Sequence, residues 1–231
     1  MGDDGKKAEA DSSNNAVAAA VPASSSSDND ADFDMENLFK YFNTCYGEDG
    51  SSLSMDSYIK GYEEIVKFLN LLGTVFGWVA SDVVAKISVL KGHVANEETG
   101  SHFVSIQTMT EYEVRENLIN YEARDSTTGS WNLLQLQRAL EYVIAFVVKL
   151  PEIGNEDKCC PVSQEAYKAT LMKFHPWIVQ KAALAAMNLL PTREGLIQKI
   201  CHGDEVSTTG IYSKIILHKM KELITNIFQY T

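Results

Sequence analysis

The chain of 231 residues has few of the residues that break helices, with only five prolines and fourteen glycines. Their scarcity allows long uninterrupted elements and argues against an architecture of many strands and turns. No run of about 18 apolar residues occurs, so the sequence offers no membrane-spanning helix. Basic residues number 20 against 31 acidic ones, for a formal net charge of −11. A strongly anionic chain is a poor nucleic-acid binder, because phosphate contacts need clustered lysine and arginine.

Motifs for catalysis and for metal binding are also missing. The sequence contains no G-x-S-x-G, P-loop, G-x-G-x-x-G or H-E-x-x-H pattern. Its five histidines are scattered, and none is paired with another at i,i+4. We therefore expect no enzymatic activity, no cofactor and no metal site.

The cysteines and the N-terminus bear on the compartment. The four cysteines include no C-x-x-C pair and do not resemble a secreted disulfide framework, which predicts reduced thiols. The N-terminus is acidic and lacks the apolar core of a signal peptide. These features favour a cytoplasmic protein.

Residues 1–32 differ from the rest in composition. They are mostly Asp, Ser, Asn and Ala, with almost no large apolar residue. Such a segment cannot bury enough apolar area to offset the entropy lost on ordering. We expect a disordered acidic tail at 1–32 and one folded domain over 33–231.

From Phe33 onward, apolar residues recur at helical spacing. The pattern predicts an all-α fold of about eight helices and no strand. The expected helices are a short one ending near Gly47, then 54–72 with Ser54 as N-cap, 75–92, 101–121, 131–150, 164–190, one after an N-cap at Thr192, and 210–230. Residues expected to face inward include Val104, Met109, Tyr112 and Leu118 in the fourth helix, and Ala166, Leu171, Phe174, Ile178, Ala182 and Met187 in the sixth.

Three groups of segments, in this order, resemble a known family. They read FLNLLGTVF at 68–76 with SDVVAK at 81–86, then NLLQLQRAL at 132–140, then AY at 166–167 with FHPWIV at 174–179 and LLPTR at 189–193. Their order and spacing resemble the glycolipid transfer protein superfamily over about 38–230, most closely its ceramide-1-phosphate transfer branch. The resemblance implies a two-layer sandwich of eight helices that carries one sphingolipid between membranes and performs no covalent chemistry.

The resemblance also implies roles in binding the lipid headgroup. Asp82 matches the carboxylate that accepts the ceramide amide N–H, and His175 matches the imidazole that donates to the amide carbonyl. Lys86, one helical turn after Asp82, matches the phosphate-binding lysine. Arg138 matches one of two phosphate-binding arginines, whereas Gln135 occupies the position of the other. Glycolipid binders have a tryptophan there, and a neutral contact to phosphate is roughly half as strong as a charge-assisted one.

An apolar pocket for the lipid chains is implied as well. A ceramide carries about 30 methylenes, and at roughly 0.8 kcal/mol each their exposure would cost on the order of 25 kcal/mol. Trp177 matches a family tryptophan at the membrane-contacting face, where an indole suits the bilayer interface. The expected lining residues are Phe68, Leu72, Val79, Val83, Phe103, Leu136, Val143, Phe146, Phe174 and Ile178.

The favoured hypothesis is a cytoplasmic, monomeric carrier of a sphingolipid, with ceramide 1-phosphate as the ligand and only transient contact with membranes. A neutral glycosphingolipid carrier that uses Gln135 as a hydrogen bonder is an alternative. Two others are a sphingolipid sensor or adaptor that signals through the acidic tail, and a helical interaction module that has lost lipid binding.

Overall fold

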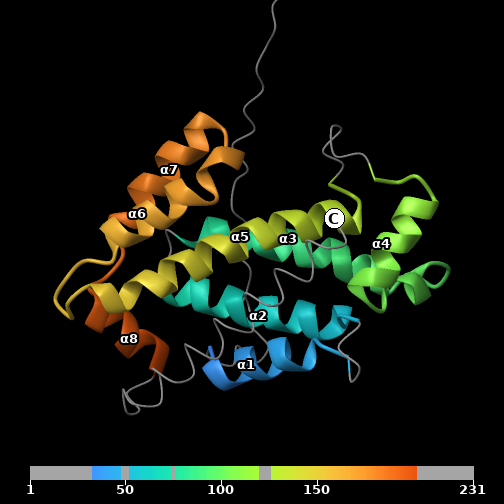
Figure 1. Ribbon diagram of the computed structural model, residues 1–231, viewed down its shortest axis with the longest axis horizontal. Helices are drawn as coiled ribbons and strands as arrows, with labels where there is room; N and C mark the ends of the chain where they lie inside the picture. Colours follow the sequence, from blue (N-terminus) through green and yellow to red (C-terminus); the bar gives the residue numbers. More distant parts are fainter. Residues whose placement is uncertain (1–32, 48–51, 74–75, 120–125, 202–231) are drawn as a thin grey trace, which may run out of the picture. The chain divides into compact units, whose positions relative to one another are not determined.

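The computed structural model describes residues 33–47, 52–73, 76–119 and 126–201, and this part of the chain is helical (Figure 1). Among these residues, strand-like pairing is limited to three isolated β-bridges. No helix in the described ranges has the length and apolar character needed to cross a bilayer. The tail at 1–32 and the helix expected at 210–230 lie outside the described residues.

The described helices are α1 (Met35–Thr44), α2 (Met55–Leu71), α3 (Gly77–Val94), η2 (Gly100–Phe103), α4 (Ile106–Arg115), α5 (Gly129–Lys149), η3 (Leu150–Glu152), α6 (Cys160–Ala169), η4 (Met172–Phe174), α7 (Trp177–Met187) and α8 (Arg193–Cys201).

Several helix ends follow local signals in the sequence. The hydroxyl of Ser54 accepts from the Ser57 backbone N–H and caps α2, which confirms its prediction as an N-cap. At the start of α8, the Thr192 hydroxyl accepts from the Gly195 N–H at 3.3 Å, as expected. Gly73 follows α2 with a φ of 105°, a conformation that glycine adopts without steric cost.

The helix predicted over 101–121 is wrong in its extent. A new helix, α4, begins after Ser105, because Ser105 and Thr108 form a capping box in which each side chain accepts from the other's backbone N–H. Val104 and Leu118, expected to face inward, lie outside α4 and are exposed. Because both residues lie beyond the ends of α4, the helical spacing of apolar residues did not predict their burial.

The single helix predicted over 164–190 is also wrong, because α6, η4 and α7 share this segment. Pro176 accounts for the last break. Its ring disfavours the helical conformation at the preceding residue, and His175 is accordingly extended, with φ −96° and ψ 141°. The period restarts at α7, so Ile178 and Ala182, expected to face inward, are exposed.

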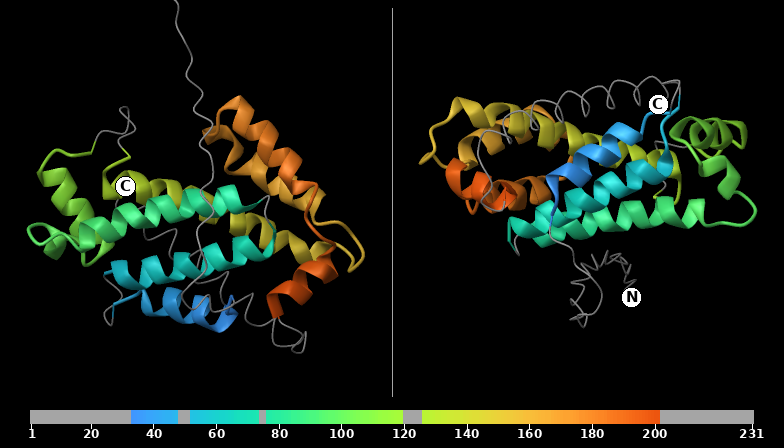
Figure 2. Two further views of the ribbon diagram at one scale, coloured as in Figure 1. Left: turned by 180° about the vertical axis from the view of Figure 1, so that it is seen from behind. Right: turned by 90° about the horizontal axis from the view of Figure 1, so that it is seen from below.

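The apolar side chains form two clusters, and α5 contributes to both. Helix α1 packs on α2, α2 on α3, α3 on α5, α5 on α6 and α6 on α7 (Figures 1 and 2). The central helix α5 thus connects the α1–α3 group to the α6–α7 group. The first cluster includes Phe42, Tyr58, Tyr62, Ile65, Leu69, Val83, Ile87, Leu90, Leu133, Leu136 and Leu140. The second includes Phe146, Leu150, Ala166, Tyr167, Ala183, Met187 and Leu196.

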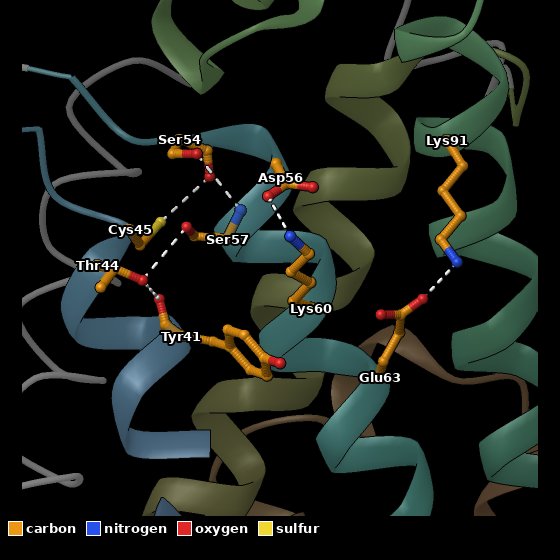
Figure 3. Close-up of polar contacts among 9 residues, drawn as sticks. All are labelled: Tyr41, Thr44, Cys45, Ser54, Asp56, Ser57, Lys60, Glu63 and Lys91. Carbon is orange, nitrogen blue, oxygen red and sulfur yellow. Dashed lines mark hydrogen bonds and ion pairs between the residues drawn. The ribbon is translucent and has the colours of Figure 1, made fainter. Parts of the chain in front are cut away.

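Polar contacts join α1 to α2 and α2 to α3 (Figure 3). The Thr44 hydroxyl of α1 lies 3.3 Å from the Ser57 hydroxyl of α2, and Lys91 of α3 forms an ion pair with Glu63 of α2. The Cys45 thiol donates to the Ser54 carbonyl at 3.4 Å, and burial raises the pKa of this thiol to about 12. A thiol that is buried and protonated is a poor nucleophile.

A buried carboxylate holds the start of α5. Glu113 of α4 is only 1% exposed, and its two oxygens accept from the backbone N–H groups of Gly129 at 2.6 Å and Ser130 at 2.9 Å. The first N–H groups of a helix have no partner within it, and the helix dipole favours a negative charge at this end. Glu113 therefore fixes the helix that carries Gln135 and Arg138.

Candidate functional site

His175 lies in the break between η4 and α7, and its Nδ1 is 2.8 Å from the hydroxyl of Tyr167 on α6. Tyr167 is buried, and burial raises the pKa of its hydroxyl, which keeps it protonated. A phenol hydroxyl can donate to an unprotonated Nδ1 or accept from a protonated one, so this distance fits either tautomer of His175. In the tautomer with its proton on Nε2, the neutral imidazole offers an N–H donor through that nitrogen.

Asp82 and Lys86 lie one turn apart on α3, as their spacing predicts, and form an ion pair of 2.5 Å between Lys86 Nζ and Asp82 Oδ1. The Lys86 side chain is 18% exposed and that of Asp82 is 62% exposed. Partial burial lowers the pKa of His175, while Asp82 raises it and Lys86 lowers it. The α3 pair therefore lies within electrostatic range of His175, and the fold brings together residues that are far apart in the sequence.

Arg138 reaches the same region from α5. Its guanidinium carbon is 3.8 Å from the centre of the Phe174 ring, and Phe174 directly precedes His175. A cation over an aromatic face is attracted by the negative face of the ring. Lys173 Nζ also lies over this ring, 4.9 Å from its centre. Lys173 was not among the site residues predicted from the sequence, although its position two residues before His175 could have indicated that it lies near the site.

Gln135 is half-buried on α5, three residues before Arg138. Residues at this spacing are neighbours on one side of a helix, so Gln135 is adjacent to the region that Arg138 occupies. Asp82 and Lys86 pair with each other and act electrostatically on His175, and Arg138 contacts Phe174, the residue before His175. Gln135 is linked to this group only by its place on α5.

The expected chain-lining residues fall into two groups. Most lie within or against the two apolar clusters, and Phe68 and Leu72 pack against both. Phe103 is buried against the rings of His93 and Tyr112. The others in this group are Val79, Val83, Leu136, Val143 and Phe146.

The second group lies at the surface around the break before α7. Phe174 is 39% exposed and Ile178 is 70% exposed, so Ile178 does not line the core. Trp177 is 71% exposed beside it, with Lys181 Nζ 5.9 Å from the centre of its ring. This surface combines large apolar side chains with lysines.

The arrangement can recognise a ligand with several polar groups. Asp82 supplies a hydrogen-bond acceptor, His175 supplies a donor, and Lys86 and Arg138 supply positive charge for an anion. Within the described residues, no group of three or more His, Cys, Asp or Glu side chains could hold a metal ion.

Replacing Tyr167 by Phe should change the protonation of His175. Without the phenol donor, we expect part of the ring proton to move to Nδ1 and the pKa of His175 to rise, because a bond that favours the neutral ring is lost. Nitrogen-15 NMR of histidine-labelled protein across a pH titration measures both changes. Tyr142→Phe is the matched control, since it removes another hydroxyl, 2.7 Å from Ser163. Identical His175 nitrogen shifts in Tyr167→Phe and the parent chain would show that Tyr167 does not set the tautomer.

Comparison with known sequences points to one family. The family model described as Glycolipid transfer protein (GLTP) matches residues 53–202. The ceramide-1-phosphate transfer protein of Xenopus laevis is 30% identical over 204 residues, which cover 86% of this chain and 91% of that protein.

Solved structures give the same result. The apo form of mouse ceramide-1-phosphate transfer protein superposes with a TM-score of 0.78 at 28% identity, covering 86% of this chain and 95% of that one. The human ceramide-1-phosphate transfer protein in complex with 12:0 ceramide 1-phosphate superposes with a TM-score of 0.76 at 26% identity, covering 85% and 96%. These likenesses confirm the predicted all-helical fold class.

Proposed function

Because this chain belongs to the glycolipid transfer protein family, we propose that it carries a sphingolipid, ceramide 1-phosphate, between membranes without covalent chemistry. The observation that supports this ligand most directly is the grouping of Asp82, Lys86 and His175. A carboxylate, an ammonium group and an imidazole donor in one place complement the amide and the phosphate at the polar end of this lipid.

Each polar side chain has a part of the ligand to match. Asp82 accepts the amide N–H, and the Nε2–H group of His175 donates to the amide carbonyl. Lys86 and Arg138 contact the phosphate through charge-assisted hydrogen bonds. In the structure, Lys86 is paired with Asp82. The phosphate therefore binds to an ammonium group whose orientation is largely set.

The two hydrocarbon chains need apolar surroundings, since their exposure would cost on the order of 25 kcal/mol. We place them between the two apolar clusters, where Phe68 and Leu72 pack against both. Phe174, at the surface beside His175, lies where the polar site meets this interior. The other proposed lining residues are Val79, Val83, Phe103, Leu136, Val143 and Phe146.

Membrane contact is assigned to the start of α7. Trp177 and Ile178 are both about 70% exposed, and such apolar side chains bury favourably at a bilayer interface. Lys181, close to the Trp177 ring, can face the lipid headgroups while its methylenes cover apolar surface. The protein would act as a monomer in the cytoplasm and touch membranes only to load and release lipid.

A neutral glycosphingolipid is the second candidate ligand, and Gln135 is the observation that favours it. This half-buried amide can donate to and accept from sugar hydroxyls, but it brings no charge for a phosphate.

Incubating the purified protein with vesicles that contain equal amounts of ceramide 1-phosphate and glucosylceramide separates the two candidates. Native mass spectrometry should show one ceramide 1-phosphate per chain, because Lys86 and Arg138 bind only the anionic headgroup strongly. A glucosylceramide adduct alone would support the second candidate, and a lipid-free chain would contradict both. Transfer of the bound lipid from donor to acceptor vesicles then distinguishes a carrier from a sensor that holds its lipid.

A further inference from the structure

The η4 turn places a second cation over the Phe174 ring that Arg138 contacts. Lys173 Nζ lies 4.9 Å from the centre of the Phe174 ring, and the Arg138 guanidinium carbon lies 3.8 Å from the same centre. One aromatic ring therefore holds two positive groups, one from α5 and one from η4. Since His175 follows Phe174 directly, both charges are close to the headgroup site.

Lys173 acts electrostatically on α5 through Glu141. Burial raises the pKa of Glu141, while Lys173 and then Arg138 lower it. Gln135 and Glu141 each lie three residues from Arg138 on α5, so both are neighbours of Arg138 on the helix surface. Lys173 therefore acts on a residue of α5 that is a neighbour of Arg138.

A count of charges shows why this lysine matters. The cations Lys86 and Arg138 are balanced by the carboxylates of Asp82 and Glu141, so these four groups together are neutral. A phosphate monoester carries about −1.5 to −2 charge at pH 7 and needs a positive site. Lys173 gives the site a net positive charge.

We propose that Lys173 is a phosphate-binding residue that supplies the positive charge missing at Gln135, so that Lys86, Arg138 and Lys173 together hold the phosphate of the lipid. This inference rests on the proposed function and adds a residue that the family resemblance does not assign. An exposed lysine near Trp177 could instead bind anionic lipids of the bilayer. The experiment therefore measures ligand binding without a membrane.

The probe is 2:0 ceramide 1-phosphate, a short-chain ligand, titrated into the full chain by calorimetry in the absence of vesicles. Lys173→Gln should weaken binding about tenfold, because one charge-assisted contact is lost. Lys173→Arg should bind nearly as well as the parent chain. Lys168→Gln is the matched control: it removes the charge of an exposed lysine on α6, one element before η4, and should leave binding unchanged. Circular dichroism verifies the fold of each variant.

A rescue variant tests whether Lys173 and position 135 share one role. Adding Gln135→Arg to Lys173→Gln should restore most of the lost affinity, because it places a new cation next to Arg138 on α5. Parent-like affinity of Lys173→Gln for the probe would overturn the inference. A parallel assay with anionic vesicles would then show whether Lys173 binds the bilayer instead. A parent chain that binds no probe would contradict the proposed function itself, and the inference with it.

Discussion

Lys86→Ala and Arg138→Ala should each reduce ceramide 1-phosphate transfer between vesicles by roughly ten- to hundredfold. Each substitution removes a cation from the proposed phosphate site, and a charge-assisted contact contributes about 1.5–3 kcal/mol. The fold should persist, because the ion pair of Lys86 with the exposed Asp82 stabilises the chain by no more than about 1 kcal/mol. Fluorescence transfer assays measure the rate, and circular dichroism measures the fold.

Lys91→Ala provides the matched control for Lys86→Ala. Lys91 is on the same helix, α3, but is paired with Glu63 of α2 (Figure 3). Its removal should leave the transfer rate close to that of the parent chain. If Lys86→Ala and Arg138→Ala also transfer at the parent rate, the phosphate does not bind at these residues.

Glu113→Ala should lower the free energy of unfolding by about 3 kcal/mol, because two backbone N–H groups lose a charged acceptor inside the protein. Glu113→Gln should cost less, since its amide oxygen can still accept one of the two bonds. Urea denaturation followed by circular dichroism gives both values.

The control for this prediction lies on the same helix. Glu111 is exposed on α4, and Glu111→Ala should change the free energy of unfolding by no more than about 0.5 kcal/mol. Similar losses in Glu111→Ala and Glu113→Ala would mean that net charge, and not the anchoring of α5, determines the stability of this region.

Some features of the site could be predicted from the sequence, and others could not. Asp82 and Lys86 were predictable as neighbours because one helical turn separates them. The break before α7 also had a local signal in Pro176, and the single helix predicted over 164–190 ignored it. Tyr167 lies within a family motif, but its bond to His175 has no signature in the sequence.

Local chemistry in the chain determined the helical class and the ends of α2 and α8, because capping by Ser54 and Thr192 and the freedom of Gly73 depend only on residues a few positions away. The hydrogen bonds from Glu113 to the start of α5 and the contact of Arg138 with Phe174 arise from the packing of separate helices. Hydrophobic periodicity says which face of a helix is buried but not which other helix covers it. Packing against α5 buries Glu113 where it accepts from the first N–H groups of that helix. The path of the chain from α6 to α7 places Lys173 and His175 close to α5 and α3, which carry Arg138 and Asp82.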